Sequence, residues 1–269
     1  MARPVPEILD TEVAVIGGGI VGLGIAFEAR RAGHAVTVID PEPVGGATFA
    51  AAGMLAPVSE LHYQEEDLLE LMLASAARWP DFVEPLLAPG FPDTGFRTTP
   101  TLVLGADAAD RAALADLRDV QLRHGLGVEQ LGTRAARAAE PLVGPHISCA
   151  YRVAQDHQVD PRGVAAAILA FLGEDVLVRS AAVGLLHEKA GDTQSTVTGV
   201  VLADGREVRA PLDLQVTADL QAPAERVREQ ARLLDLVGHV LEDVVAPAVD
   251  VHEAVEGDIP AGMAGCHLG

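Results

Sequence analysis

The sequence predicts an α/β fold in which helices cover a parallel β-sheet. Two observations predict the sheet: residues 13–16 and 35–39 are short apolar runs, joined by a glycine-rich turn and a helical segment. Apolar runs without alternation are typical of parallel strands buried on both faces. A third observation, β-branched segments between about 175 and 208, predicts a neighbouring antiparallel β-meander.

The turn after the first strand has the spacing Gly17-x-Gly19-x-x-Gly22. Gly17 permits a tight turn, Gly19 lets a phosphate approach the backbone, and Gly22 lets helix and strand pack closely. The helix from about Ile20 to Arg31 points its free amides and its positive dipole end at the same place, and Gly33 ends it. This Rossmann-like arrangement predicts a dinucleotide site. The alternative is a glycine turn that serves packing only.

The second strand ends at Asp40, about 20 residues after the glycines. A carboxylate at this position accepts hydrogen bonds from the ribose hydroxyls of adenosine. It would repel a 2′-phosphate, which argues against NADP.

Residues 41–60 read PEPVGGATFAAAGMLAPVSE, a stretch of small side chains. Small side chains let the backbone run against a flat ring system, where main-chain amides can bond to ring oxygens and nitrogens. The alternative is an alanine-rich helix with ordinary packing.

Composition limits the remaining possibilities. The chain has 269 residues, 49% of them apolar, and a formal net charge of −20. This charge disfavours nucleic acid and anionic membranes as partners. Two cysteines, Cys149 and Cys266, are too few for a disulfide framework or a metal cluster. Without a signal-peptide pattern or a long apolar run, the sequence predicts a cytoplasmic protein with no bound metal and no membrane association.

Helical periodicity predicts further helices. One spans about 65–87, where Pro80 is expected to end or kink it and a second helix is expected to begin near Phe82. A strand is predicted at 101–105 and a helix at 106–125. Asp160 and Pro161 predict the N-cap and first turn of another helix, which runs to residue 173.

The β-meander comprises DVLVRSAAV (175–183), STVTGVVLAD (195–204) and REVRAP (206–211), with a hairpin turn at 203–206. Residues 212–217 (LDLQVT) are the candidate for a strand that returns to the parallel sheet.

Three segments together resemble a known family: GGGIVG (17–22), VTVID (36–40) and ATFAAAGMLAPVSE (47–60). They resemble the FAD-dependent amino-acid oxidases of the D-amino-acid oxidase type, and most of all the glycine oxidase branch that serves thiamine biosynthesis. DHQVDPR (156–162) is similar to the same family's segment before its next helix. The resemblance implies FAD as cofactor and a Rossmann-like FAD-binding domain.

The resemblance also implies where FAD is contacted, beyond the three glycines of the turn. The amides of Ile20 and Val21 would meet the pyrophosphate, and Ala47 and Thr48 would lie along it. Asp40 and Pro41 would lie at the adenosine ribose. Ala52, Gly53 and Met54 would approach the isoalloxazine ring, and Val183 would meet the adenine through its backbone. An ordinary strand residue is the alternative for Val183.

The resemblance stops near residue 220. We expect residues 1–220 to form the FAD-binding domain, with part of the substrate domain inserted. Residues 221–269 do not resemble the family and predict a helix followed by irregular chain. The substrate domain is therefore expected to be incomplete or missing, as in a truncated, frame-shifted or diverged enzyme.

The resemblance implies oxidative deamination of glycine or another small amino acid, with oxygen as the second substrate. No catalytic residue is assigned. Two alternatives remain open: a catalytically dead dinucleotide-binding fragment, and another FAD-dependent amino-acid or amine dehydrogenase. Whether the protein forms a homo-oligomer is open as well.

Overall fold

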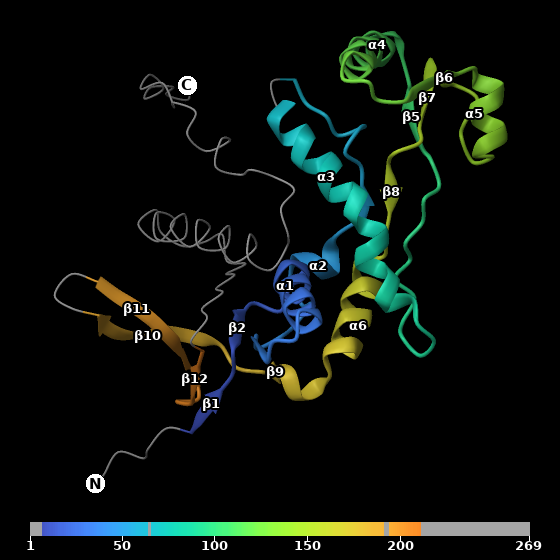
Figure 1. The fold of residues 1–269 in the computed structure, drawn as a ribbon. Helices are drawn as coiled ribbons and strands as arrows, with labels where there is room; N and C mark the ends of the chain where they lie inside the picture. The colour runs from blue at the N-terminus through green and yellow to red at the C-terminus, as the bar shows by residue number, and fades with distance from the viewer. Residues whose placement is uncertain (1–6, 64–65, 191–193, 211–269) are drawn as a thin grey trace, which may run out of the picture. The chain divides into compact units, whose positions relative to one another are not determined.

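The structure is a computed structural model that describes residues 7–63, 66–190 and 194–210 (Figure 1). The chain divides into two units, residues 1–218 and 219–269. The second unit lies outside the described residues, as do the predicted returning strand at 212–217 and the predicted C-terminal helix.

A parallel sheet forms the centre of the nucleotide-binding part. Its strands have the order β2-β3-β9, with Val13 opposite Val36 and Val38 opposite Leu177. Helix α1 joins β2 to β3, and helix α6 leads through the 3-10 turn η2 into β9. Their bounds are β2 Val13–Ile16, α1 Ile20–Arg31, β3 Val36–Ile39, α6 Pro161–Leu172, η2 Glu174–Val176 and β9 Leu177–Val178. The predicted parallel sheet and its helix are confirmed.

An antiparallel meander lies beside this sheet, as the sequence predicts, but its first strand was wrongly assigned: residues 177–178 pair with β3 as strand β9, and the meander begins at Ala182. It consists of β10 (Ala182–Ala190), β11 (Gln194–Leu202) and β12 (Glu207–Arg209). The turn before β12 contains Gly205 at a φ of +89°, a conformation that favours glycine. A short strand that the sequence analysis missed, β1 (Ile8–Asp10), pairs in parallel with β12.

The core explains why a ligand would lie at an edge of the parallel sheet. On one face, Phe27 of α1 is fully buried and packs edge-on against Phe171 of α6, with ring centroids 4.8 Å apart. On the other face, Ala14 and Ile39 share a cluster with Leu202 of the meander. Both faces are covered, so the ends of the strands are what remains for binding.

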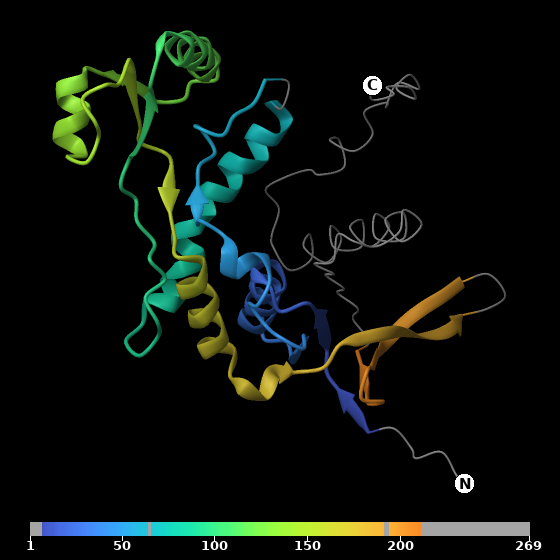
Figure 2. The same ribbon diagram turned by 180° about the vertical axis from the view of Figure 1, so that it is seen from behind.

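Strands β4 (Met54–Leu55) and β8 (His157–Gln158) pair antiparallel. A separate sheet of three strands is inserted in the chain between them. It has the order β5-β7-β6 and lies together with α4 and α5 in both views (Figure 2). The inserted elements are α3 Glu66–Val83, η1 Glu84–Leu87, β5 Thr101–Gly105, α4 Ala108–Arg123, β6 Val128–Leu131, α5 Thr133–Ala139 and β7 Cys149–Val153. Strand β5 and helix α4 were predicted, whereas β6, α5 and β7 were not.

Pro80 does not have the predicted effect. Helix α3 continues through Pro80 to Val83, and a 3-10 turn (Glu84–Leu87) replaces the second helix expected near Phe82. Pro80 removes one hydrogen bond of the helix, which continues for three more residues before the 3-10 turn begins. The buried side chains of Val83 and Leu86 anchor this end of the helix. Within the described part of the chain, no helix combines the length and apolar character needed to span a bilayer.

Candidate functional site

The candidate site lies at the carboxyl edge of the parallel sheet, which we define as the ends of β2 and β3 with the glycine turn between them. Gly17 has a φ of +106°, and its amide donates to the carbonyl of Ile39 at 2.9 Å. A Cβ added at Gly22 would collide with the carbonyl oxygen of Gly17. Both glycines are therefore required by the turn and by the close packing of helix on strand.

Gly19 differs from its two partners in the motif. A Cβ at Gly19 would meet Thr48 Oγ1 at 3.5 Å, an ordinary contact, and no other described atom within 4 Å. Its backbone, with φ −76° and ψ 176°, is extended and open to any residue. The described chain thus gives no packing reason for glycine here, whereas close approach of a phosphate does.

Asp40 is bound to the glycine turn through its carboxylate. Its Oδ2 accepts from the amide of Gly18 at 2.6 Å, and its Oδ1 accepts from the amide of Glu42 at 2.7 Å. A Cβ at Gly18, whose importance the sequence analysis missed although it lies inside the motif, would come within 3.0 Å of Asp40 Cβ. The carboxylate is half-buried at the tip of β3, and Pro41 beside it is exposed.

Thr48 connects the small-residue segment to the helix that follows the glycines. It lies in α2 (Ala47–Ala50), is 5% exposed, and accepts from the amide of Ile20 at 2.8 Å. Its own hydroxyl hydrogen has no acceptor among the described residues. A buried donor without an acceptor is costly. Because Gly19 is adjacent and open, an oxygen of a bound phosphate fits this place.

Large apolar side chains are exposed around this edge. Val21 is 61% exposed, Phe49 62% and Met54 64%, and the small residues Ala47 and Ala52 are exposed as well. The alternative of an alanine-rich helix with ordinary packing does not describe this segment, since α2 has four residues and only Thr48 among them is buried. A flat ring system lying against the segment would cover these side chains.

Gly53 has a structural role of its own. Its φ is +81°, its carbonyl accepts from the amide of Val159 at 2.9 Å, and an added Cβ would collide with the carbonyl oxygen of Val159. Glycine therefore lets the 47–54 segment cross closely over the chain that enters α6.

Val183 lies at an irregularity of the meander. In the register of β10 with β11, Ala182 pairs with Leu202 and Gly184 with Val201, so Val183 has no residue opposite it. Its side chain is 63% exposed. A residue that bulges out of the ladder can direct its backbone groups to a ligand.

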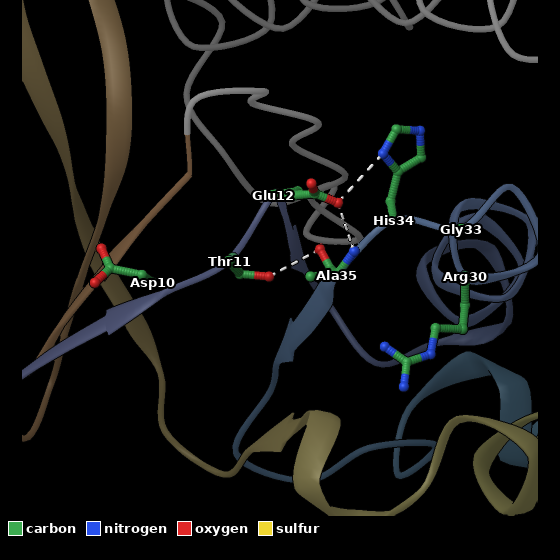
Figure 3. Close-up of a pocket in the computed structure, with 7 residues that line it drawn as sticks. All are labelled: Asp10, Thr11, Glu12, Arg30, Gly33, His34 and Ala35. Atoms are coloured by element: carbon green, nitrogen blue, oxygen red, sulfur yellow. Dashed lines mark hydrogen bonds and ion pairs between the residues drawn. The ribbon is translucent and has the colours of Figure 1, made fainter.

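A hollow of about 610 Å³ lies elsewhere, at the amino edge of the sheet, which we define as the starts of β2 and β3. Figure 3 shows Glu12 accepting from the amide of Ala35 (2.7 Å) and facing His34 Nδ1 (3.5 Å), while Thr11 donates to the carbonyl of Ala35. None of the predicted cofactor residues lines this hollow.

The structure thus gathers most of the predicted residues at one edge. Hydrogen bonds link the glycine turn to Asp40 and to Thr48, and the amide of Asp40 donates to Val178, five residues before Val183. The sequence analysis missed Arg162, whose guanidinium donates to the carbonyl of Phe49 at 3.1 Å. Only its position after Asp160 and Pro161 could have indicated it, because its partner is 113 residues away.

Comparison with protein families agrees with this geometry. The family model described as FAD dependent oxidoreductase matches residues 12–256. The chain belongs to this family. The predicted resemblance and the predicted FAD cofactor are confirmed, and the match extends beyond residue 220.

Three relatives have short but clear sequence matches to this chain, and two of them are named for reactions of amino acids. Glycine oxidase of Geobacillus kaustophilus is 40% identical over 76 residues, which cover 28% of this chain and 20% of that protein. The bifunctional protein ThiO/ThiG of Synechocystis is 42% identical over 78 residues, 28% of this chain and 12% of that protein. D-amino acid dehydrogenase of Methylobacterium nodulans is 49% identical over 47 residues, 17% of this chain and 11% of that protein.

Solved structures show the fold. The crystal structure of the Geobacillus kaustophilus glycine oxidase has a TM-score of 0.67 to this chain at 22% identity. The superposition covers 78% of this chain and 55% of the glycine oxidase, so the chain spans about half the length of that enzyme.

Proposed function

We propose that this FAD dependent oxidoreductase oxidatively deaminates glycine or another small amino acid, as a glycine-oxidase-like enzyme of thiamine biosynthesis. The observation that carries the proposal is the carboxyl edge, where Gly19 is open, the Thr48 hydroxyl lacks an acceptor within the described chain and apolar side chains are exposed. The substrate class is supported by the name of the glycine oxidase relative, and the link to thiamine biosynthesis by the ThiO/ThiG relative.

The pyrophosphate of FAD would be held by the open backbone at Gly19, by the amide of Val21 and by the hydroxyl of Thr48. The amide of Ile20 already donates to Thr48 Oγ1 and orients that hydroxyl. The free backbone amides at the start of α1, together with the positive end of the helix dipole, stabilise the negative charge of the phosphates. The helix start therefore fixes the diphosphate, from which the two ends of the cofactor extend.

The adenosine end would lie at Asp40 and Pro41, with the adenine at the backbone of Val183. The flavin end would lie along Ala52, Gly53 and Met54, whose small or flexible side chains permit close approach of a ring. When bound, FAD supplies the acceptor for the hydrogen removed from the substrate's α-carbon. Exposed Met54 and Phe49 would help to exclude water from this face of the ring.

A second candidate is an FAD-dependent amino-acid dehydrogenase, which would pass electrons to an acceptor other than oxygen. It is favoured by the 49% identity with D-amino acid dehydrogenase of Methylobacterium nodulans, although that match covers only 11% of the relative. A third candidate is a dinucleotide-binding protein without catalysis.

One set of measurements separates these candidates. The purified chain, reconstituted with FAD, is expected to show a flavin absorbance spectrum and to release hydrogen peroxide with glycine, sarcosine or D-alanine. Reduction of an electron-accepting dye without peroxide would identify a dehydrogenase. A flavin spectrum without turnover would identify the binding protein, and a colourless protein that cannot be reconstituted with FAD would overturn both enzyme candidates. Cytoplasmic location and homo-oligomerisation remain predictions, which cell fractionation and sedimentation would test.

A further inference from the structure

Arg162, the second residue of α6, reaches across to the segment that carries the proposed flavin contacts. Its Nη1 donates to the carbonyl of Phe49 at 3.1 Å, and its guanidinium carbon lies 5.9 Å from the centre of the Phe49 ring. Its Nε lies 3.4 Å from Asp160 Oδ1. One side chain therefore joins the start of α6 to the end of α2 by a charge-assisted hydrogen bond and a cation–π contact, while its ion pair with Asp160 stays within the start of α6.

Arg162 is held in place by its neighbour Asp160, which makes several contacts of its own. Asp160 caps α6 by accepting from the amide of Arg162 at 3.0 Å, and its own amide donates to the carbonyl of Thr94 at 2.9 Å. A Cβ at Gly95 would approach Asp160 N to 2.7 Å, so the two chains are in close contact. In the same loop, the carboxylate of Asp93 accepts a hydrogen bond from the amide of Gly95 and another from the Arg97 guanidinium. Both interactions, the first more than the second, lower the pKa of Asp93.

Helix α2, the segment that Arg162 contacts, depends on contacts outside itself for its stability. Helix α2 has four residues, and a helix of that length has too few internal bonds to be stable alone. Thr48 holds its first turn to α1. Arg162 donates to the carbonyl of Phe49 near the other end of α2. Three residues later the chain reaches Ala52, the first proposed flavin contact.

We propose that Arg162 is a positioning residue for the flavin: it fixes Phe49, and through it the backbone of residues 51–54, at the distance from α6 that the isoalloxazine ring requires. This inference rests on the proposed function. Arg162 acts through Phe49 and is not itself assigned a contact with substrate or cofactor.

The test compares three variants of the full chain reconstituted with FAD. Arg162→Met removes both polar contacts of the guanidinium, Arg162→Lys keeps a positive charge near the Phe49 carbonyl, and Arg152→Met is the control. Arg152 is a half-exposed arginine with one ion pair, to Glu129 at 3.3 Å, and lies in the β5-β7-β6 sheet. For each protein we would measure the Kd for FAD, the visible circular dichroism of the bound flavin, and the Tm without cofactor.

Arg162→Met is expected to weaken FAD binding about fivefold, since one half-exposed charged hydrogen bond is lost, and to change the circular dichroism of the bound flavin. Arg162→Lys is expected to restore much of both, and Arg152→Met to match the parent protein. Equal Kd values and equal flavin spectra for Arg162→Met and Arg152→Met would overturn the inference. If Arg162→Met does not fold, Arg162→Gln takes its place, and a Kd and flavin spectrum equal to those of Arg152→Met would overturn the inference equally. Failure of the parent protein to bind FAD would instead refute the proposed function.

Discussion

The two edges of the same parallel sheet differ in what they offer to a ligand. At the amino edge a hollow of about 610 Å³ is present, yet Thr11, Glu12 and Ala35 satisfy one another's hydrogen-bonding groups. At the carboxyl edge the Thr48 hydroxyl lacks an acceptor among the described residues, and Val21 and Met54 are exposed. The edge predicted to bind FAD therefore has the features expected where a ligand lies, although the hollow is at the other edge.

This difference follows from strand direction. In open α/β sheets the helix that follows a strand begins at the carboxyl edge, so its free amides collect there. The amino edge receives helix C-termini instead, here the end of α1 with Gly33 and His34. Substitutions at the two edges should therefore separate cofactor binding from stability.

The largest effect is expected from Gly22→Ala. The new Cβ would collide with the carbonyl oxygen of Gly17, so β2 and α1 must separate, at a cost of about 3 kcal/mol in unfolding free energy. Gly24→Ala in the same helix is the matched control, because its Cβ would meet only Phe82 Cζ at 3.9 Å. That control should raise stability by about 0.5–1 kcal/mol. Denaturant unfolding measures both, and equal midpoints would contradict the close packing of β2 and α1.

Asp40→Ala should reduce FAD affinity at least about tenfold, because the hydrogen bonds proposed between the ribose and this carboxylate would each be worth about 1.5–3 kcal/mol. Quenching of FAD fluorescence on titration with protein measures the Kd. Glu42→Ala is the control, since its carboxylate is exposed and only its backbone amide contacts Asp40. An unchanged affinity in Asp40→Ala would remove the ribose assignment.

Thr48→Val should weaken FAD binding about fivefold, since it removes one buried donor to the phosphate while the shape is kept. Thr48→Ser retains the hydroxyl and should bind nearly as well as the parent. Thr48→Val also leaves the amide of Ile20 without its acceptor, so the Tm of the cofactor-free protein should fall slightly. If Thr48→Ser and Thr48→Val bind FAD equally, the hydroxyl has no role in binding.

Glu12→Ala, at the amino edge, should leave FAD affinity unchanged. It removes an exposed carboxylate that accepts from the Ala35 amide at 2.7 Å and faces His34, and the expected loss of stability is about 0.5 kcal/mol. Fluorescence titration and thermal unfolding check both statements. A clear loss of FAD affinity would show that the two edges are coupled and would weaken the comparison.

The sequence predicted the elements that depend on interactions between nearby residues and missed those that depend on pairing between distant ones. Helix α1 begins at Ile20 and ends at Arg31 as predicted, because its start, period and stop are encoded within 20 residues. Strands β6 and β7 were missed. Val128 and Glu129 of β6 find their partners Val153 and Arg152 of β7 about 24 residues later, and no local pattern records that pairing.

The sequence by itself determined the glycine turn, the acid at Asp40, the parallel strands and the family, because each rests on short-range spacing and on apolar periodicity. Only the tertiary structure decided that Gly53 packs on Val159, that Thr48 binds the first turn of α1, and that Arg162 reaches Phe49. These contacts join residues 28 to 113 positions apart. They form only once the sheet, α1 and α6 have packed, so no local propensity specifies them.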